Sequence, residues 1–278
     1  MCILFVYTDP DPAQDGYRLI VASNRDEYYV RPAKKAFKCE TTGVIAGRDM
    51  EVGREGGSWL GMSTYPTDAY KYRFGALLNV TGESKESHKG RGFIVIDYLE
   101  GTMPIEDYQQ YLHKDDVDYH SYNFVSIDLG KEITIRHTTN AENEIDSSFD
   151  GTGKQVLAFG NSTVTTPLQK VLAGRTQFES IVNKLNSKKL SGQLTYQLIE
   201  LLKLTERHLP DPELQRRAPK SYKELSSIYV EMVQPGYGTR THTVILVDHD
   251  WNLQFKEVTM KEPINAEQPE WEDTNITD

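Results

Sequence analysis

The sequence predicts an α+β fold in which sheets pack together and helices cover their outer faces. Runs of strand length, rich in apolar and β-branched residues, dominate both ends of the 278-residue chain. Patterns of helical period lie between these runs. The order of strands, helices, strands, helices and strands is typical of packed sheets with helices outside. No linker or repeat divides the chain, so we expect a single domain over residues 1–260.

The elements follow in chain order from this pattern. A helix is expected near 91–112, and two more are expected where apolar residues recur at helical spacing, over 168–185 and 194–202. Residues 261–278 contain two prolines and many acidic side chains, which predicts a flexible, solvated tail. Strands are expected at 2–7, 17–23, 58–64, 73–80, 122–128, 131–137, 155–160, 227–233, 241–247 and 253–258.

The charge balance argues against nucleic acid as a partner. The chain carries 31 Lys and Arg against 41 Asp and Glu, a net charge of -10. A surface of this sign repels phosphate backbones. A small-molecule ligand is the more plausible partner.

The two cysteines and the N-terminus indicate a cytoplasmic protein. Cys2 and Cys39 cannot build a secreted disulfide framework, and the histidines show no metal-ligand spacing, so we expect no metal site. The apolar run at 3–7 has no basic flank, unlike a signal peptide. No run approaches the roughly 20 apolar residues of a membrane span, so no transmembrane segment is expected.

Cys2 is the first residue that could carry chemistry. Removal of Met1 would place a thiol and a free α-amine on the same residue, and the amine could take the thiol proton near neutral pH. The alternative is a small apolar residue that opens a strand.

The segment Ser23-Asn24-Arg25-Asp26-Glu27 follows an apolar strand, and we expect it where the chain leaves the sheet. A surface turn with an ordinary ion pair is one interpretation. In the functional interpretation, Arg25 lowers the pKa of the Cys2 thiol and Asp26 orients the amine.

Three further polar residues lie at expected strand ends. Asn161 either caps a helix or donates into a cleft, and Asn79 either forms a turn or stabilises an oxyanion. Arg240 is either a surface cation or a buried anchor for an anion.

Taken together, these segments resemble the transport and Golgi organisation protein 2 family, also called the Asn-Arg-Asp-Glu (NRDE) family. The resemblance runs from residue 1 to about residue 260, in the family's order and spacing. The motifs that carry it are Met1-Cys2-Ile3, Ser23-Asn24-Arg25-Asp26-Glu27, Glu55-Gly56-Gly57-Ser58-Trp59-Leu60-Gly61, Gly90-Arg91-Gly92, Tyr122-Asn123-Phe124, Gly160-Asn161-Ser162, Leu209-Pro210-Asp211-Pro212 and the segment from Pro235 to Asp248.

The resemblance implies a fold and a site. The family is similar to the choloylglycine and penicillin V acylases, which implies a four-layer αββα sandwich of the N-terminal-nucleophile (Ntn) hydrolase type. It implies no acylase counterpart for Glu27. The implied site residues are the nucleophile Cys2, the neighbouring pair Arg25 and Asp26, the oxyanion donor Asn161, the less certain donor Asn79 and the second arginine Arg240.

Two functions remain open, and a scaffold that organises membranes is a third, simpler interpretation. The family's association with haem mobilisation and with lipid and acyl-coenzyme A homeostasis implies a carrier of haem or another amphipathic metabolite, near mitochondria or Golgi membranes. Cys2, His242 or a tyrosine could bind haem iron as cargo, although no spacing marks any of them. The residues themselves favour hydrolysis of an amide or thioester by Cys2, which needs no cofactor. The family association places handling slightly ahead of hydrolysis.

If Cys2 is a nucleophile, two predictions follow, one about processing of the N-terminus and one about the structure. Met1 should be removed, because the base does not exist until the Cys2 amine is free. Cys2, Arg25, Asp26, Asn161 and Arg240 should converge on one concave site.

Overall fold

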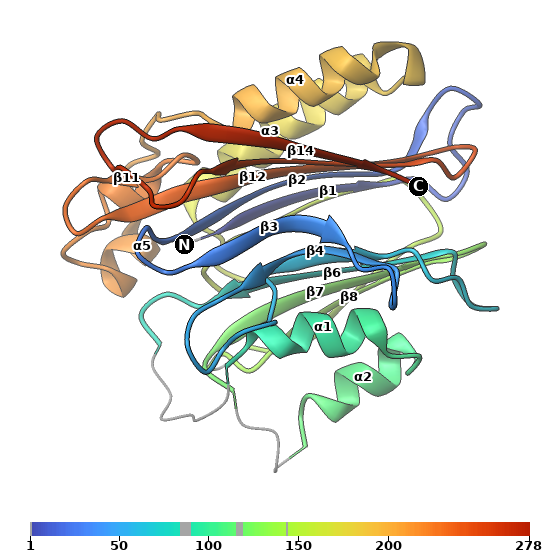
Figure 1. Cartoon of the computed structure of the whole chain (residues 1–278), viewed down its shortest axis with the longest axis horizontal. Coiled ribbons are helices and arrows are strands. Elements are labelled where there is room, and N and C mark those ends of the chain that lie inside the picture. Colours follow the sequence, from blue (N-terminus) through green and yellow to red (C-terminus); the bar gives the residue numbers. More distant parts are fainter. Residues whose placement is uncertain (1, 84–89, 115–118, 143) are drawn as a thin grey trace. The chain divides into compact units, whose positions relative to one another are not determined.

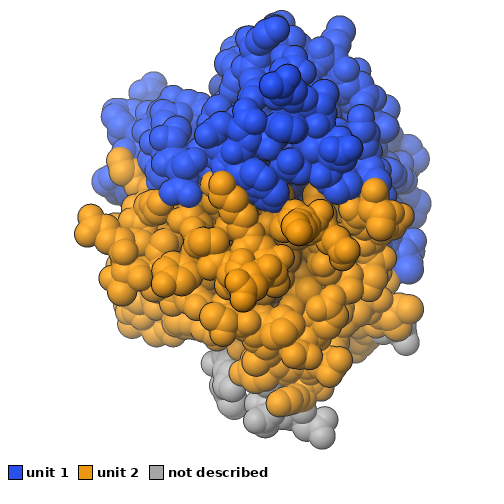
Figure 2. All heavy atoms as spheres, turned by 90° about the vertical axis from the view of Figure 1, so that its right-hand side faces the viewer, with its two compact units in different colours: residues 1–31, 153–278 blue, residues 32–152 orange. Residues whose placement is uncertain are grey.

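The computed structural model describes residues 2–83, 90–114, 119–142 and 144–278. The chain divides into two compact units, coloured blue and orange in Figure 2. We call residues 1–31 with 153–278 the terminal unit, and residues 32–152 the central unit. Of the expected site residues, Asn79 belongs to the central unit and the others belong to the terminal unit.

The terminal unit is built on an antiparallel sheet with the strand order β10-β1-β2-β12-β13-β14, and β11 pairs with β12. β2 and β12 are therefore interior strands with hydrogen-bonded neighbours on both sides. The strands described in this unit are β1 (Ile3–Thr8), β2 (Tyr17–Tyr28), β10 (Gln155–Phe159), β11 (Glu231–Met232), β12 (Tyr237–Asp248), β13 (Leu253–Met260) and β14 (Trp271–Thr277).

Two helices, α3 (Gln169–Leu185) and α4 (Ser191–Leu202), cover one face of this sheet (Figure 1). Their apolar residues meet those of β1, β2 and β12 in one buried core. The shorter helical segments are η1 (Lys188–Leu190), α5 (Pro212–Arg217) and η2 (Glu224–Ser226).

The central unit is an antiparallel sheet whose strands follow in chain order from β3 to β9. Helices α1 (Gly92–Glu100) and α2 (Ile105–Tyr111) pack against it (Figure 1). The strands described here are β3 (Ala33–Lys38), β4 (Val44–Asp49), β5 (Leu60–Ser63), β6 (Tyr72–Asn79), β7 (Tyr122–Leu129), β8 (Ile133–Thr139) and β9 (Ser147–Phe149).

Two glycine-containing motifs in the central unit serve packing. A Cβ atom on Gly92, the first residue of α1, would lie 3.0 Å from the Cα atom of Gly57. The backbone N–H of Ser58 donates to the Gly92 carbonyl at 2.9 Å. Only glycine allows the helix and the turn before β5 to approach this closely.

The structure agrees with the predicted α+β class, while the four-layer arrangement remains a prediction. The expected helix near 91–112 is two helices, because Gly101 ends α1 and Pro104 precedes α2. The expected strand at 227–233 shrinks to β11.

The structure differs most from expectation at residues 261–278. Residues 271–277 form β14, which pairs with β13 from Trp271 opposite Met260 to Thr277 opposite Gln254. An edge strand with one solvent-facing side can carry acidic residues there, which gives it the composition of a tail.

Candidate functional site

The Asn-Arg-Asp segment lies inside the sheet and not where the chain leaves it. β2 continues to Tyr28, so Asn24, Arg25 and Asp26 are flanked by β1 or by β12. All three side chains are buried. The prediction of a strand end at residue 23 was wrong, because pairing with neighbouring strands extends β2 through a polar stretch of low β propensity.

Cys2 lies against this segment. Ile3 pairs with Asn24, so one step further along the antiparallel register places Cys2 opposite Arg25. The Cys2 backbone N–H donates to Asn161 Oδ1 at 2.5 Å. The Asp26 backbone N–H donates to the Cys2 sulfur, a contact that favours the thiolate. Cys2, Arg25, Asp26 and Asn161 are thus brought together.

Burial and charge set the protonation of the thiol. Burial raises the pKa of the Cys2 thiol, and the Asp26 carboxylate raises it further. The Arg25 guanidinium acts in the opposite direction and lowers that pKa. The thiol therefore needs a base close by to become a nucleophile.

Asp26 is held by its neighbours in the buried interior. Thr239 on β12 donates its hydroxyl to Asp26 Oδ1 at 2.6 Å. Burial raises the pKa of the Asp26 carboxyl, while Lys170 and the Thr239 hydrogen bond lower it. Neither Thr239 nor Lys170 was expected at the site, because Thr239 has no assigned role within the segment from Pro235 to Asp248 and Lys170 lies in no motif.

Asn161 follows β10 directly and is fully buried. Helix α3 begins later, with Leu168 at its N-cap, so Asn161 does not cap that helix. Its carbonyl oxygen binds the Cys2 nitrogen instead.

Arg240 is buried at a bulge in β12, where Asp26 pairs with Thr239 and Arg25 pairs with Thr241. Its guanidinium donates to the Tyr28 carbonyl at 3.2 Å and to the Arg31 carbonyl, and it pairs with Glu262. Within the described part of the chain, these bonds lead away from Cys2. Arg240 anchors the turn after β2.

Asn79 ends β6, where it pairs with Tyr122 in the register of the central unit. It belongs to a different compact unit from Cys2. Its oxyanion role remains a prediction.

Comparisons with known proteins identify the family of the chain. The model of the protein family described as "Transport and Golgi organisation 2" matches residues 1–262. Transport and Golgi organization protein 2 of Drosophila melanogaster is 38% identical over 265 residues, which cover 94% of this chain and 92% of that protein. The chain belongs to the transport and Golgi organisation 2 family. The Bos taurus homolog is 33% identical over 99% of this chain and 97% of its own length, and the Homo sapiens homolog is 33% identical over 94% and 93%.

Asn24 and Glu27, in the Asn-Arg-Asp-Glu segment, have partners other than Cys2. Asn24 Nδ2 donates to the carbonyls of Leu202 and Ile228 at 2.8 and 3.0 Å, and Asn24 Oδ1 lies 2.6 Å from His242 Nδ1. Asn24 therefore ties β2 to the end of α4. Glu27 lies 3.3 Å from Arg31, an i,i+4 pair at the start of the turn.

The family's Leu-Pro-Asp-Pro segment is also structural. Asp211 Oδ1 accepts from the backbone N–H of Leu214, which caps α5, and Asp211 Oδ2 accepts from that of Gln169, at the start of α3, each at 2.8 Å. One buried carboxylate thus fixes two helix N-termini.

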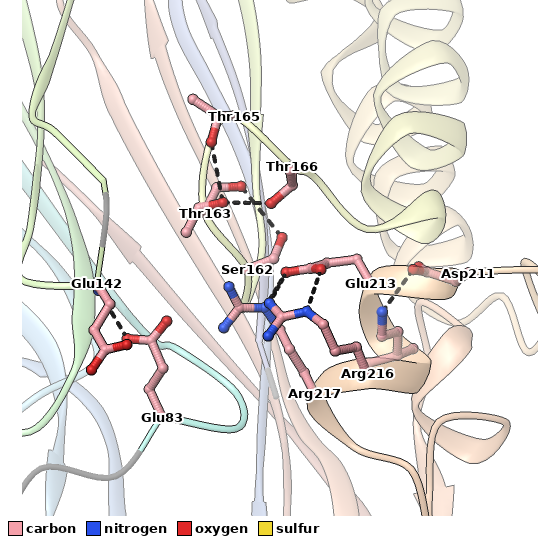
Figure 3. Close-up of polar contacts among 11 residues, drawn as sticks. Glu83, Glu142, Ser162, Thr163, Thr165, Thr166, Asp211, Glu213, Arg216 and Arg217 are labelled. Atoms are coloured by element: carbon pink, nitrogen blue, oxygen red, sulfur yellow. Dashed lines mark hydrogen bonds and ion pairs between the residues drawn. The ribbon is translucent and has the colours of Figure 1, made fainter.

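Next to Asn161, hydroxyl groups bond to one another. Thr163 Oγ1 lies 2.6 Å from Thr166 Oγ1 and 3.3 Å from Thr165 Oγ1 (Figure 3).

On α5, Glu213 binds both Arg216 and Arg217 (Figure 3).

The described ranges contain neither a membrane-spanning helix nor a metal-binding cluster of side chains. None of the helices there is long and apolar enough to cross a membrane. No group of three His, Cys, Asp or Glu residues in those ranges could hold a metal ion.

Proposed function

We propose that this family member is an N-terminal cysteine hydrolase that cleaves an amide or thioester of an amphipathic acyl compound. The observation that supports it is the hydrogen bond from the Cys2 backbone nitrogen to Asn161, beside Arg25 and Asp26. Removal of Met1 would convert this nitrogen into an α-amine already oriented next to the thiol. Nucleophile and base would then be positioned by the same residue.

The chemistry follows from these positions. The amine takes the thiol proton, the sulfur bonds to the carbonyl carbon, and the carbonyl oxygen becomes an oxyanion. Asn161 Oδ1 accepts a hydrogen bond from the amine, which keeps the proton and leaves the Asn161 Nδ2 end as an oxyanion donor. The leaving amine or thiol takes the proton as its bond to carbon breaks. Water then hydrolyses the acyl-cysteine, releasing the free acid and restoring the thiol.

A carrier of haem or another amphipathic metabolite is the second candidate. It is favoured by the raised pKa of the Cys2 thiol only in so far as a thiol that stays neutral is a poor nucleophile. His242 fits iron ligation poorly, since its ring is buried and stacked on Trp271 at 4.9 Å. In this second candidate function, the protein carries its ligand near Golgi or mitochondrial membranes.

The test uses protein whose N-terminus is known to be Cys2. Wild type, Cys2→Ser and Cys2→Ala are incubated with acyl-coenzyme A thioesters and N-acyl amides, and free acid is measured. The same proteins are titrated with haem by absorption spectroscopy. Cys39→Ser is the matched control, because Cys39 lies on the β3–β4 turn of the central unit.

Hydrolysis predicts turnover that Cys2→Ala abolishes and Cys39→Ser leaves unchanged. Binding of uncleaved substrate should persist in Cys2→Ala, since only the attacking atom is removed. Saturable haem binding without hydrolysis, lost on Cys2→Ser, would instead establish the carrier.

A further inference from the structure

Lys170 is a buried cation that the proposed chemistry does not use. It lies in the first turn of α3 and its side chain is fully buried. Its Nζ group donates to the Ser227 carbonyl at 3.0 Å. A cation at a helix N-terminus opposes the helix dipole, and its burial adds a desolvation cost. Such a residue needs a compensating partner.

The fold places this first turn beside the Cys2 site. A Cβ atom on Gly160 would collide with the side chain of Val171, so α3 begins directly against the end of β10. The next residue, Asn161, binds the Cys2 nitrogen. Lys170 thus approaches the site from the helix layer.

The charges that act on Lys170 come from three elements. They are Asp26 on β2, Cys2 before β1, and Asp211 before α5. The Asp211 oxygens already accept two backbone N–H groups. Asp26 accepts the Thr239 hydroxyl, and its burial opposes ionisation. Lys170 lies on the Asp26 side of β2, because Lys170 Nζ donates to the Ser227 carbonyl while Asn24, two residues before Asp26 on the same face of the strand, donates to the adjacent Ile228 carbonyl.

We propose that Lys170 is a positioning residue that keeps the Asp26 carboxylate ionised next to Cys2. Once Met1 is removed, an ionised Asp26 would accept a further hydrogen bond from the Cys2 amine, whereas a protonated one would compete as a donor. The proposal rests on the proposed role of Asp26 beside that amine. Lys170 acts through Asp26 and needs no contact with substrate.

The test measures Asp26 protonation directly. The carbonyl band of protonated carboxyl groups is followed by infrared spectroscopy against pH in wild type, Lys170→Gln and Lys170→Arg. Subtracting the matching Asp26→Asn spectra isolates the Asp26 band. Lys170→Gln keeps an N–H donor for the Ser227 carbonyl and removes only the charge. Lys184→Gln, at an exposed position of α3, is the matched control.

In Lys170→Gln the Asp26 midpoint should move to higher pH, by on the order of one pH unit. Lys170→Arg and Lys184→Gln should leave it near the wild-type value. An unchanged midpoint in a folded Lys170→Gln protein would overturn the proposal. If Lys170→Gln does not fold, a raised Asp26 midpoint in folded Lys170→Arg would overturn it equally.

The infrared result does not depend on turnover. A protein that hydrolyses nothing could still show the Lys170 effect, so the failure of this inference and the failure of the proposed function are separate outcomes.

Discussion

Arg25 is a residue whose charge acts on the Cys2 thiol. The Arg25 guanidinium lowers the pKa of a thiol that burial raises. In a Cys39→Ser background, Arg25→Met should therefore raise the Cys2 pKa and slow alkylation near neutral pH by about three- to tenfold. Arg25→Lys should retain most of the rate.

The measurement is the pH dependence of iodoacetamide alkylation, with the site assigned by the mass of the N-terminal peptide. The Cys39→Ser background is needed because hydrogen bonds from Thr42 and Thr41 lower the pKa of the Cys39 thiol, so it would react first. If the alkylation rates of the Cys39→Ser protein with and without Arg25→Met had the same pH dependence, Arg25 would not affect the pKa of the Cys2 thiol.

His242 makes stability depend on pH. Burial lowers its pKa from 6.5 to about 3, so the folded state holds the ring neutral while the unfolded state protonates below 6.5. The unfolded state binds more protons between these values, and stability is lost as pH falls through this window, at about 1.4 kcal/mol per pH unit. His242→Gln should flatten this dependence in chemical denaturation, and His113→Gln, at an exposed position, should not. Parallel curves for wild type and His242→Gln would contradict the assignment.

Among the elements, helix α3 depends on close contact with β1. A Cβ atom on Gly174 would overlap the ring of Phe5, which is fully buried and stacked on Phe178 at 5.6 Å. Gly174→Ala should therefore cost about 1–3 kcal/mol in the free energy of unfolding, despite the better helix propensity of Ala.

Gly192 in α4 provides the matched control. A Cβ atom there meets no atom within 4 Å, so Gly192→Ala should leave stability unchanged or raise it by up to about 1 kcal/mol. Urea denaturation of both variants decides the point. A Gly174→Ala protein as stable as wild type would show that α3 does not pack on β1 this closely.

For the whole molecule, the last residues belong to the sheet. β14 pairs with β13 over its length, and Trp271 stacks on the buried His242 ring. Deleting 271–278 should lower the urea midpoint clearly, because it exposes the β13 edge and that ring. Trp271→Ala should cause part of this loss. If the deletion left the midpoint unchanged, the expected solvated tail would be the better description.

The sequence predicted much of the strand framework and the proximity of several polar residues, for identifiable reasons. Apolar strands such as β1 and β12 are recognisable because they are buried on both faces. β3, which carries three lysines, and β14 were missed because an edge strand needs few apolar residues. The motifs indicated Cys2 as a candidate site residue. They did not indicate that Asn24 binds the end of α4 while Asp26 lies beside Cys2, because that difference depends on packing that no single motif encodes.

Lys170 and Thr239 were missed for the same reason. Each becomes relevant only through its position beside Asp26, from a helix and a strand distant in sequence. Arg240 was expected at the site, and the structure shows it binding carbonyls of the turn after β2.

The proposed hydrolase requires that Cys2 becomes the N-terminal residue and acts as the nucleophile. The most direct test is mass spectrometry of the N-terminal peptide from protein isolated from its native cell, before and after brief exposure to an acyl thioester. The proposed mechanism predicts a peptide that begins at Cys2 and gains the acyl mass on its sulfur. A peptide that retains Met1 in every molecule, with no acyl group on Cys2, would contradict it.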